Sequence, residues 1–406
     1  MKAIIQPSTL SGDIQAIASK SQAHRLLICA ALATDKTVIL CPTLSADITA
    51  TADCLRALGA DISYKNGVFT VDPIREKPAH AVIDCGESGS TLRFLLPVVC
   101  ALGVDTDIVM HGRLPERPLS PLWEELEGHG AVLSRPKPDV IAVSGQLTGG
   151  DYTLAANISS QFISGLLFAL PLLGGDSRIN LTGTLESGSY LAMTVKAQAL
   201  FGVRSAFDGA AYTISSQPYV SPGTAHVEGD WSNAAFWVCA DRICGGTLNI
   251  TGLDPDSPQG DRAVERLSLR VAGGSAAVDC QDVPDLVPVL SVLASVSPGE
   301  TRFINAGRLR IKESDRLATT AGLLTALGGS VQELDDGLVV AGKLRLTGGE
   351  VDSANDHRIA MSAAIAALAS DGPVILHGAQ AVNKSYPAFW DDYARLGGKV
   401  ILEDEP

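Results

Sequence analysis

The sequence has few aromatic residues and no long apolar run, and these shortages limit the kinds of protein it can encode. Aromatic residues make up 5% of the 406 residues and charged residues 19%, against 46% hydrophobic residues. This composition predicts a folded chain with an aliphatic core and excludes a disordered protein. No apolar stretch approaches the roughly 18 residues of a membrane-spanning helix, and no secretion signal is visible. We therefore expect a cytoplasmic protein without a membrane partner.

Positive charge is also scarce. The formal net charge is −14, which argues against nucleic acid as a partner but not against a small anion bound by local cations. The cysteines are scattered, without a C-x-x-C pair or a histidine at ligand spacing: Cys29, Cys41, Cys54, Cys85, Cys100, Cys239, Cys244 and Cys280. We expect reduced, buried thiols and no metal site.

A pattern of about seventy residues recurs along the chain. In each copy a helical segment ends at a glycine, and a strand, a turn and a second strand follow. The glycines are predicted to adopt positive φ at helix C-termini. They recur at intervals of 71, 72, 71, 55 and 69 residues: Gly59, Gly130, Gly202, Gly273, Gly328 and Gly397. The period predicts six α/β units, three in each of two domains, with a boundary near residues 221–230.

Long apolar segments lie between these glycines. Each is hydrophobic nearly all round, which predicts a helix buried inside its domain. The segments cover residues 23–33, 91–102, 161–173, 234–244, 285–296 and 359–370.

A Gly/Ser-rich turn at residues 84–91 leads into the second of these helices. Backbone N–H groups at a helix N-terminus favour an anion, although a plain helix cap has the same composition. The turn is not a Walker A loop, because no Gly-Lys-Ser/Thr follows its glycines. The chain also has no G-x-G-x-x-G fingerprint, so no nucleotide cofactor is expected.

Other helix starts carry polar groups of the same kind. Lys20 and Arg25 can converge on a phosphate or carboxylate, or form a solvated helix start. Residues 159–161, Ser-Ser-Gln, are either hydroxyl and phosphate contacts or a cap. Asp285 precedes a very apolar helix, either as a cap or as a general base whose pKa burial raises.

The densest polar cluster occupies residues 308–316, where Lys312 and Arg316 alternate with Glu313 and Asp315. A surface ion-pair ladder is the alternative interpretation of this cluster. Seven cations at helix starts or in special loops predict a positive cleft for two anionic substrates, at least one of them phosphorylated. They are Lys20, Arg25, Arg117, Lys312, Arg316, Arg358 and Lys384.

These motifs, in this order, resemble the 5-enolpyruvylshikimate-3-phosphate synthase family. The matching stretches are Ser19-Lys20-Ser21 with Arg25, Ser88–Arg93, Glu116-Arg117-Pro118, Ser159–Gln161, Pro284-Asp285, Lys312–Arg316, Asn355–Arg358 and Lys384. The resemblance implies a transferase, 3-phosphoshikimate 1-carboxyvinyltransferase, of the shikimate pathway to chorismate and the aromatic amino acids. It would move the enolpyruvyl group of phosphoenolpyruvate to the 5-hydroxyl of shikimate 3-phosphate and release phosphate.

The resemblance also implies the fold, a two-domain inside-out α/β barrel built of six βαβαββ repeats, three per domain. The N-terminal domain would comprise residues 15–227, and residues 1–14 would join residues 228–406 in the C-terminal domain. The active site would lie in the cleft between the domains, which closes on substrate. A monomer without cofactor is expected.

Roles for single residues follow from the same resemblance. Asp285 is implied to accept a proton and Glu313 to donate one, with Lys20 as a helper. Shikimate 3-phosphate would contact Lys20, Ser21, Arg25, Ser159, Ser160, Gln161, Ser187, Asp285 and Lys312. Phosphoenolpyruvate would contact Lys20, Gly89, Arg117, Gln161, Arg316, Arg358 and Lys384.

Two positions depart from the family pattern. Glu87 stands two residues before Gly89, where the family usually has asparagine, and Arg308 replaces an asparagine at a shikimate-phosphate contact. Glu87 would repel phosphoenolpyruvate unless it is protonated, turned away or paired. It also leaves sensitivity to mimics of phosphoenolpyruvate, such as glyphosate, without a prediction.

Two rival functions share this scaffold. A UDP-N-acetylglucosamine enolpyruvyl transferase usually carries a reactive cysteine just before an Arg-Pro, and residues 110–118 contain none. A non-catalytic phosphometabolite-binding protein would lack the acid or the base, and this chain has both Asp285 and Glu313.

Overall fold

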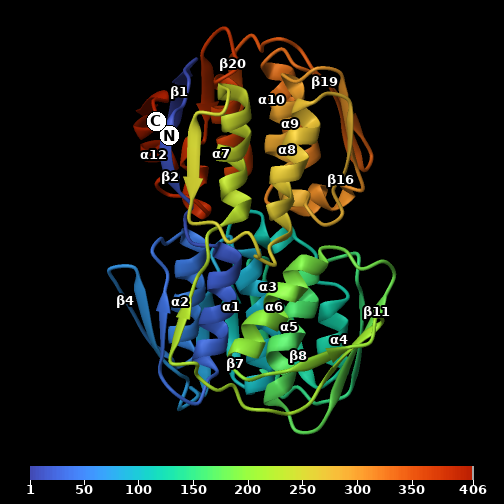
Figure 1. The fold of residues 1–406 in the computed structure, drawn as a ribbon. Helices are drawn as coiled ribbons and strands as arrows, with labels where there is room; N and C mark the ends of the chain where they lie inside the picture. The colour runs from blue at the N-terminus through green and yellow to red at the C-terminus, as the bar shows by residue number, and fades with distance from the viewer. Residues whose placement is uncertain (405–406) are drawn as a thin grey trace. The chain divides into compact units, whose positions relative to one another are not determined.

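The computed structural model describes residues 1–404, and its internal contacts divide the chain into two compact units. Unit 1 combines Met1–Ile17 with the described part of Gly229–Pro406, and unit 2 is the continuous segment Ala18–Glu228. Each unit is an assembly of sheets and helices, coloured by position along the chain in Figure 1.

Unit 2 contains three sheets of four strands, in the orders β14-β3-β5-β4, β6-β7-β9-β8 and β10-β11-β13-β12. The strands are β3 (Thr37–Leu40), β4 (Asp61–Lys65), β5 (Val68–Asp72), β6 (His80–Asp84), β7 (Asp105–Val109), β8 (Ala131–Lys137), β9 (Val140–Gly145), β10 (Asp151–Ala155), β11 (Ser177–Thr182), β12 (Ser205–Phe207), β13 (Ala211–Ile214) and β14 (Thr224–His226). The helices are α1 (Lys20–Ala31), α2 (Ala46–Ala57), α3 (Gly89–Leu102), α4 (Leu122–Gly128), α5 (Ser160–Ala169) and α6 (Gly188–Leu200), with 3-10 turns η1 (Leu114–Glu116) and η2 (Leu170–Leu172).

Unit 1 contains two sheets of four strands, β16-β17-β19-β18 and β20-β21-β1-β22, and the two-stranded sheet β15-β2. The strands are β1 (Lys2–Gln6), β2 (Gly12–Gln15), β15 (Leu248–Thr251), β16 (Ala276–Asp279), β17 (Glu300–Ile304), β18 (Ser330–Leu334), β19 (Gly337–Ala341), β20 (Gly349–Asp352), β21 (Val374–His377) and β22 (Lys399–Glu403). The helices are α7 (Trp231–Cys244), α8 (Val264–Ala272), α9 (Val287–Ser295), α10 (Arg316–Ala326), α11 (His357–Ala367) and α12 (Phe389–Arg395), with 3-10 turns η3 (Gly260–Ala263), η4 (Pro284–Leu286), η5 (Gly307–Ile311) and η6 (Ala379–Lys384).

One repeating unit explains the five four-stranded sheets. In β6-α3-β7-α4-β8-β9 the first two strands are parallel, and β9 lies antiparallel between β7 and β8. The α/β fold with repeated sheet–helix units is therefore confirmed. The last repeat obtains its final strand from the N-terminus, because β1 pairs antiparallel with both β21 and β22. The first repeat obtains its first strand from the end of unit 2, where β14 pairs parallel with β3.

The fourth repeat is shorter than its sequence pattern predicts. It consists of β2, α7, β15 and α8, and the next strand in the chain, β16, already belongs to the following sheet. Within the described residues this repeat has no antiparallel pair, which accounts for the 55-residue interval. The predicted stop at Gly273 is also wrong, because its φ is −73° and the positive φ of 91° falls on Gly274. The other five stop glycines have positive φ.

The long apolar segments form the buried helices that the sequence predicts. In α11 all eleven residues are buried, and in α3 twelve of fourteen are. Within each unit the strands lie toward the outside and these helices toward the middle (Figure 1). Apolar side chains therefore gather in two separate cores, one in each unit.

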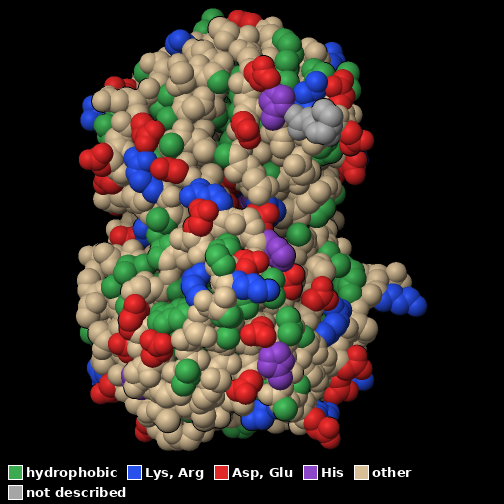
Figure 2. Space-filling view, turned by 180° about the vertical axis from the view of Figure 1, so that it is seen from behind, with side chains coloured by type: hydrophobic (Ala, Val, Ile, Leu, Met, Phe, Trp, Pro, Cys, Tyr) green, Lys and Arg blue, Asp and Glu red, His purple; other side chains and the backbone are tan. Residues whose placement is uncertain are grey.

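The remaining surface carries mixed charge. On the face shown in Figure 2, acidic, basic and apolar side chains are interspersed. All eight cysteines are free thiols, and seven of them are buried. Among the helices of residues 1–404, none combines the length and apolar character needed to cross a membrane. The same residues contain no group of three or more His, Cys, Asp or Glu side chains suited to a metal.

Candidate active site

In unit 2, the first polar cluster forms where α1 begins. Lys20 is the first residue of α1, and its Nζ lies 2.8 Å from Oδ2 of Asp47, in the first turn of α2. Arg25 lies one turn further and is 2% exposed. Its guanidinium donates to the carbonyl oxygens of Ser21 and Tyr190, at 2.6 and 2.9 Å, and to Oγ1 of Thr194 at 2.8 Å. Burial lowers the pKa of Arg25 to about 10, so it stays charged at neutral pH.

The second cluster of unit 2 surrounds the start of α3. Gly89 is the first residue of that helix, and a methyl group there would lie 2.7 Å from Nη1 of Arg117 and 2.9 Å from Nη1 of Arg93. Arg93 also donates to Oε1 of Gln161 at 2.8 Å, and Nε2 of Gln161 donates to Oγ of Ser90 at 2.9 Å. Two arginines and one amide thus converge on a backbone position that only glycine leaves open.

Buried polar side chains connect α1, α2 and α3 in unit 2. His24 on α1 is hydrogen-bonded to Thr51 on α2 at 2.7 Å, and Thr51 to Thr91 on α3 at 2.6 Å. Thr91 then donates to Ser88, the N-cap of α3, at 2.8 Å. Burial and the charges of Lys20 and Arg25 hold the pKa of His24 well below its usual value, so the imidazole is neutral. This network fixes the turn that carries Gly89.

The serines predicted to bind shikimate 3-phosphate occupy helix N-termini. Ser159 is the N-cap of α5 and accepts from the Gln161 N–H at 3.3 Å, while Ser160 is the first residue of α5. Ser187 is the N-cap of α6, with φ of 55°, and is 2% exposed. Ser164 and Thr194 are hydrogen-bonded at 2.8 Å, so α5 is tied to the hydroxyl that Arg25 contacts.

In unit 1, Arg316 is the centre of an ionic cluster at the start of α10. This guanidinium is 1% exposed and donates to three carboxylates. Its Nη1 lies 2.7 Å from Oδ1 of Asp285, its Nη2 2.7 Å from Oε2 of Glu313, and its Nε 2.8 Å from Oδ2 of Asp356. The surface ladder considered for residues 308–316 is thus wrong for Arg316, which is buried among acids.

Arg358, in the first turn of α11, reaches the same carboxylate from another direction. Its Nη2 donates to Oδ2 of Asp285 at 3.1 Å and to Oγ of Ser232 at 2.6 Å. Lys312 Nζ lies 3.9 Å from Oδ1 of Asp285. Asp285 therefore has three cations around it.

These cations decide the protonation state of Asp285. Burial raises its pKa, but Arg358, Lys312 and Arg316 outweigh burial and hold the pKa far below the usual range. The alternative in which burial leaves Asp285 with a raised pKa is therefore wrong in this arrangement. Burial lowers the pKa of Lys312 to about 8, despite the opposing effect of Asp285.

Lys384 and the two positions that depart from the family pattern, Arg308 and Glu87, make contacts of their own. Lys384, at the end of η6, donates to the carbonyl oxygen of Asn355 at 2.6 Å, next to Asp356. Arg308 donates to the carbonyl oxygen of Gln281 at 2.9 Å. A methyl group on Gly112 would lie 2.4 Å from Oε2 of Glu87, so that carboxylate lies over the loop that follows β7.

Several residues in these clusters were not predicted. Arg93 lies inside the Ser88–Arg93 stretch that matches the family. A charged residue within an otherwise apolar helix indicates a functional position. Asp356 also lies in a quoted motif and is the N-cap of α11. Asp47, Thr194 and Ser232 have no local signal, because only the packing of separate helices within each unit brings them into these clusters.

With this geometry in hand, similarity to known proteins decides the family. The family model described as EPSP synthase (3-phosphoshikimate 1-carboxyvinyltransferase) matches residues 4–393. The chain belongs to the EPSP synthase family. Two relatives named 3-phosphoshikimate 1-carboxyvinyltransferase come from Clostridium acetobutylicum and Clostridium perfringens. The first is 41% identical and covers 98% of this chain and 97% of its own length, and the second is 40% identical and covers 100% of both.

Solved structures agree with the EPSP synthase fold. EPSP synthase from Acinetobacter baumannii superposes with a TM-score of 0.81 at 23% identity and covers 99% of this chain and 100% of its own. The enolpyruvyl transferase NikO from Streptomyces tendae gives 0.77 at 18% identity, with 98% of each chain covered. At these identities the two structures support the fold alone.

Proposed function

We propose that this EPSP synthase family member transfers the enolpyruvyl group of phosphoenolpyruvate to the 5-hydroxyl of shikimate 3-phosphate and releases phosphate. The observation that carries the proposal is the pair of half-buried carboxylates on one buried guanidinium, since Asp285 and Glu313 both contact Arg316. Attack of a hydroxyl on the enol carbon needs a base for the hydroxyl and an acid for the methylene carbon. Asp285 is the proposed base and Glu313 the proposed acid, with Lys20 as a helper.

The cations would also stabilise negative charge during this reaction. Addition of the 5-hydroxyl oxygen to C2 of phosphoenolpyruvate gives a tetrahedral intermediate that carries carboxylate and phosphate, and fixed cations stabilise such charge. The proposed contacts of phosphoenolpyruvate are Lys20, Gly89, Arg117, Gln161, Arg316, Arg358 and Lys384. Those of shikimate 3-phosphate are Lys20, Ser21, Arg25, Ser159, Ser160, Gln161, Ser187, Asp285 and Lys312.

Without substrate, the ionised Asp285 is a weak base, because Arg358, Lys312 and Arg316 hold its pKa far below the usual range and so lower its affinity for a proton. We infer that an anionic substrate at these guanidiniums competes with Asp285 for the same N–H donors. Each donor that turns to the substrate weakens the stabilisation of the carboxylate, so its pKa rises toward a value useful for proton transfer. Binding of phosphoenolpyruvate would in this way activate the base for the second substrate.

In this proposal both predicted domains take part in binding, and the protein acts as a monomer in the cytoplasm. The predicted domains, residues 15–227 and residues 1–14 with 228–406, would each supply contacts to both substrates. Both substrates are small molecules, and no further partner is proposed.

The deciding experiment measures phosphate release from phosphoenolpyruvate with two acceptors in parallel. We expect release with shikimate 3-phosphate and none with UDP-N-acetylglucosamine. Release only with UDP-N-acetylglucosamine would favour the rival transferase. Binding of both substrates without release in either reaction would favour a non-catalytic binding protein.

A further inference from the structure

A buried acid that is not among the proposed substrate contacts lies near Arg358. Asp261 belongs to η3, directly before α8, and is 3% exposed. The groups that act on it are Ser232 and Asp230 at the start of α7, Asp285 from η4 and Arg358 from α11. On its own segment, the charged side chains of Arg262 and Glu265 are exposed. Asp261 therefore interacts with residues from three other elements of unit 1.

Ser232 connects this acid to Arg358. The Ser232 hydroxyl accepts from Nη2 of Arg358 at 2.6 Å, and the same Nη2 donates to Asp285 at 3.1 Å. The Ser232 side chain is also hydrogen-bonded to Asp261. A hydroxyl has one proton, so donation to ionised Asp261 leaves its lone pairs for Arg358. The result is a chain from Asp261 through Ser232 and Arg358 to Asp285.

The loop that carries Asp261 is fastened to the start of α7. Oε1 of Gln259 accepts from the Trp231 N–H at 3.0 Å, and Nε2 of Gln259 donates to the carbonyl oxygen of Gly229 at 2.8 Å. Nε1 of Trp231 donates to the carbonyl oxygen of Asp254 at 3.0 Å. These bonds hold Asp261 and Ser232 at a fixed separation.

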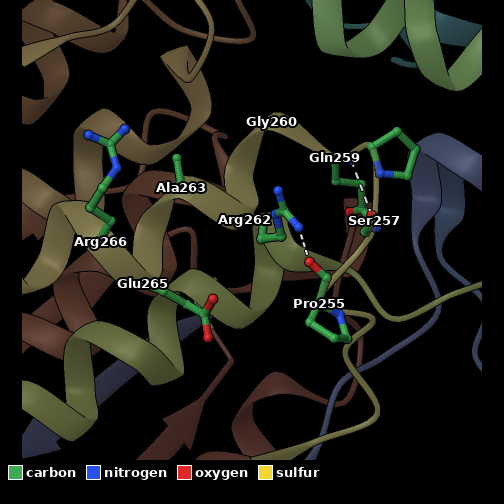
Figure 3. Close-up of a pocket in the computed structure, with 9 residues that line it drawn as sticks. Pro255, Ser257, Gln259, Gly260, Arg262, Ala263, Glu265 and Arg266 are labelled. Carbon is green, nitrogen blue, oxygen red and sulfur yellow. Dashed lines mark hydrogen bonds between the residues drawn. The ribbon is translucent and has the colours of Figure 1, made fainter.

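The outer side of the same loop faces a cavity of about 520 Å³. Figure 3 shows Arg262 donating to the Pro255 carbonyl across this cavity, and the short turn from Ser257 to Gln259. None of the nine residues that line the cavity is among the proposed substrate contacts.

We propose that Asp261 is a positioning residue for phosphoenolpyruvate: through the Ser232 hydroxyl it fixes the orientation of the Arg358 guanidinium. The inference depends on the proposed function, in which Arg358 contacts phosphoenolpyruvate. Asp261 itself touches neither substrate nor the reacting atoms. Its substitution should therefore weaken phosphoenolpyruvate binding and leave the intrinsic rate of the chemical step nearly unchanged.

The position of Asp261 also predicts that the affinity for phosphoenolpyruvate depends on pH. Burial and the neighbouring Asp285 raise the pKa of Asp261 to about 6, against the opposing effects of Arg358 and Ser232. Of the charged groups around it, Asp285 has a pKa far below this range, and Arg358 stays cationic. Asp261 is ionised above about pH 6, so its support of Arg358 is present there. This support is lost as the pH falls through 6.

The experiment compares Asp261→Asn and Ser232→Ala with Asp256→Asn, an exposed acid of the same loop, as the matched control. Steady-state kinetics with both substrates are measured from pH 5 to 8, together with the thermal midpoint. We expect Asp261→Asn and Ser232→Ala each to raise KM for phosphoenolpyruvate about tenfold at pH 7.5, with kcat and KM for shikimate 3-phosphate within about twofold. The double variant should be no worse than either single variant, because both changes break one chain.

The pH profile separates positioning from a merely structural role. The phosphate of phosphoenolpyruvate titrates with a pKa of about 6 as well, and this contribution remains in every variant. We expect the wild type and Asp256→Asn to lose additional affinity below pH 6, and Asp261→Asn and Ser232→Ala to lack that additional loss. Unchanged KM for phosphoenolpyruvate in Asp261→Asn, or equal losses for both substrates, would overturn the inference.

Two outcomes remain interpretable if a variant or the function itself fails. If Asp261→Asn does not fold, Ser232→Ala alone must show the raised KM and the altered pH profile, and normal values would overturn the inference. If the wild type does not turn over shikimate 3-phosphate, the proposed function fails. Wild-type turnover with normal variants refutes only the role of Asp261.

Discussion

The two units hold their buried arginines in different ways. In unit 2, Arg25 and Arg93 donate to backbone carbonyls, a hydroxyl and an amide, whereas Lys20 pairs with the carboxylate of Asp47. In unit 1, Arg316 and Arg358 donate to carboxylates, with Asp285 shared between them. A cation held by neutral groups still attracts an anion, whereas a cation held by acids mainly orients them. We infer that Arg25 and Arg93 of unit 2 act mainly through affinity for anions, while unit 1 also supplies the proton-transfer groups Asp285 and Glu313.

The largest effect should come from the carboxylates of unit 1. Asp285→Asn or Glu313→Gln removes the proposed base or acid, and kcat should fall roughly 10²- to 10⁴-fold. Circular dichroism and substrate binding should remain close to wild type, because each amide keeps the shape of the carboxyl. Near-normal turnover in both variants would contradict the assignment of acid and base.

The next largest effect should come from Arg25 in unit 2. Arg25→Ala removes three charge-assisted hydrogen bonds and an uncancelled charge, and KM for shikimate 3-phosphate should rise roughly 30- to 100-fold. The same change should reduce kcat much less than the unit 1 variants do. A fall in kcat that exceeds the rise in KM would remove the distinction between the two units.

A smaller effect is expected at Gly89. In Gly89→Ala the new methyl group would lie within 3 Å of both Arg117 and Arg93. Both guanidiniums would have to move, and KM for phosphoenolpyruvate should rise about tenfold. Gly128→Ala is the matched control, because a methyl group on that helical glycine meets nothing within 4 Å. Equal kinetics in the two variants would show that no ligand approaches the Gly89 backbone.

The smallest predicted effect is the pH response of Lys312. Burial lowers its pKa to about 8, and only the protonated amine attracts an anion. Affinity for shikimate 3-phosphate should therefore be highest below pH 8 and fall about fivefold between pH 7 and 9. Lys312→Arg, which stays charged, should abolish the fall. A wild-type profile that is flat over this range would exclude Lys312 from the binding site.

Local sequence patterns predicted most of the fold. Stop glycines and all-round apolar segments are local signals, and five of six glycines and all six buried helices followed them. The prediction was wrong for the fourth repeat because, among residues 1–404, no antiparallel strand pair follows α8, and β16 of the next sheet comes directly after its stop. The pairing of β1 with β21 and β22 spans most of the chain, and only the family resemblance predicted that the N-terminal strand joins the C-terminal domain.

The candidate site residues also differ in whether a local sequence pattern could predict them. Lys20, Arg25, Asp285 and Arg316 stood out because polar residues interrupt apolar helices at their starts. The ionisation of Asp285 could not be predicted, since burial and the neighbouring cations shift its pKa in opposite directions. Which effect is larger depends on distances between residues that lie far apart in the sequence. Asp261 and Ser232 remained hidden for the same reason.

The central position of β1 has a consequence for synthesis on the ribosome. Unit 2 is one continuous segment, so its three sheets can form as soon as β14 has left the exit tunnel. Strand β1 emerges first of all, yet its two neighbours, β21 and β22, emerge almost last. We expect Lys2–Gln6 to stay unpaired through most of translation, exposing strand edges on which chaperones commonly act.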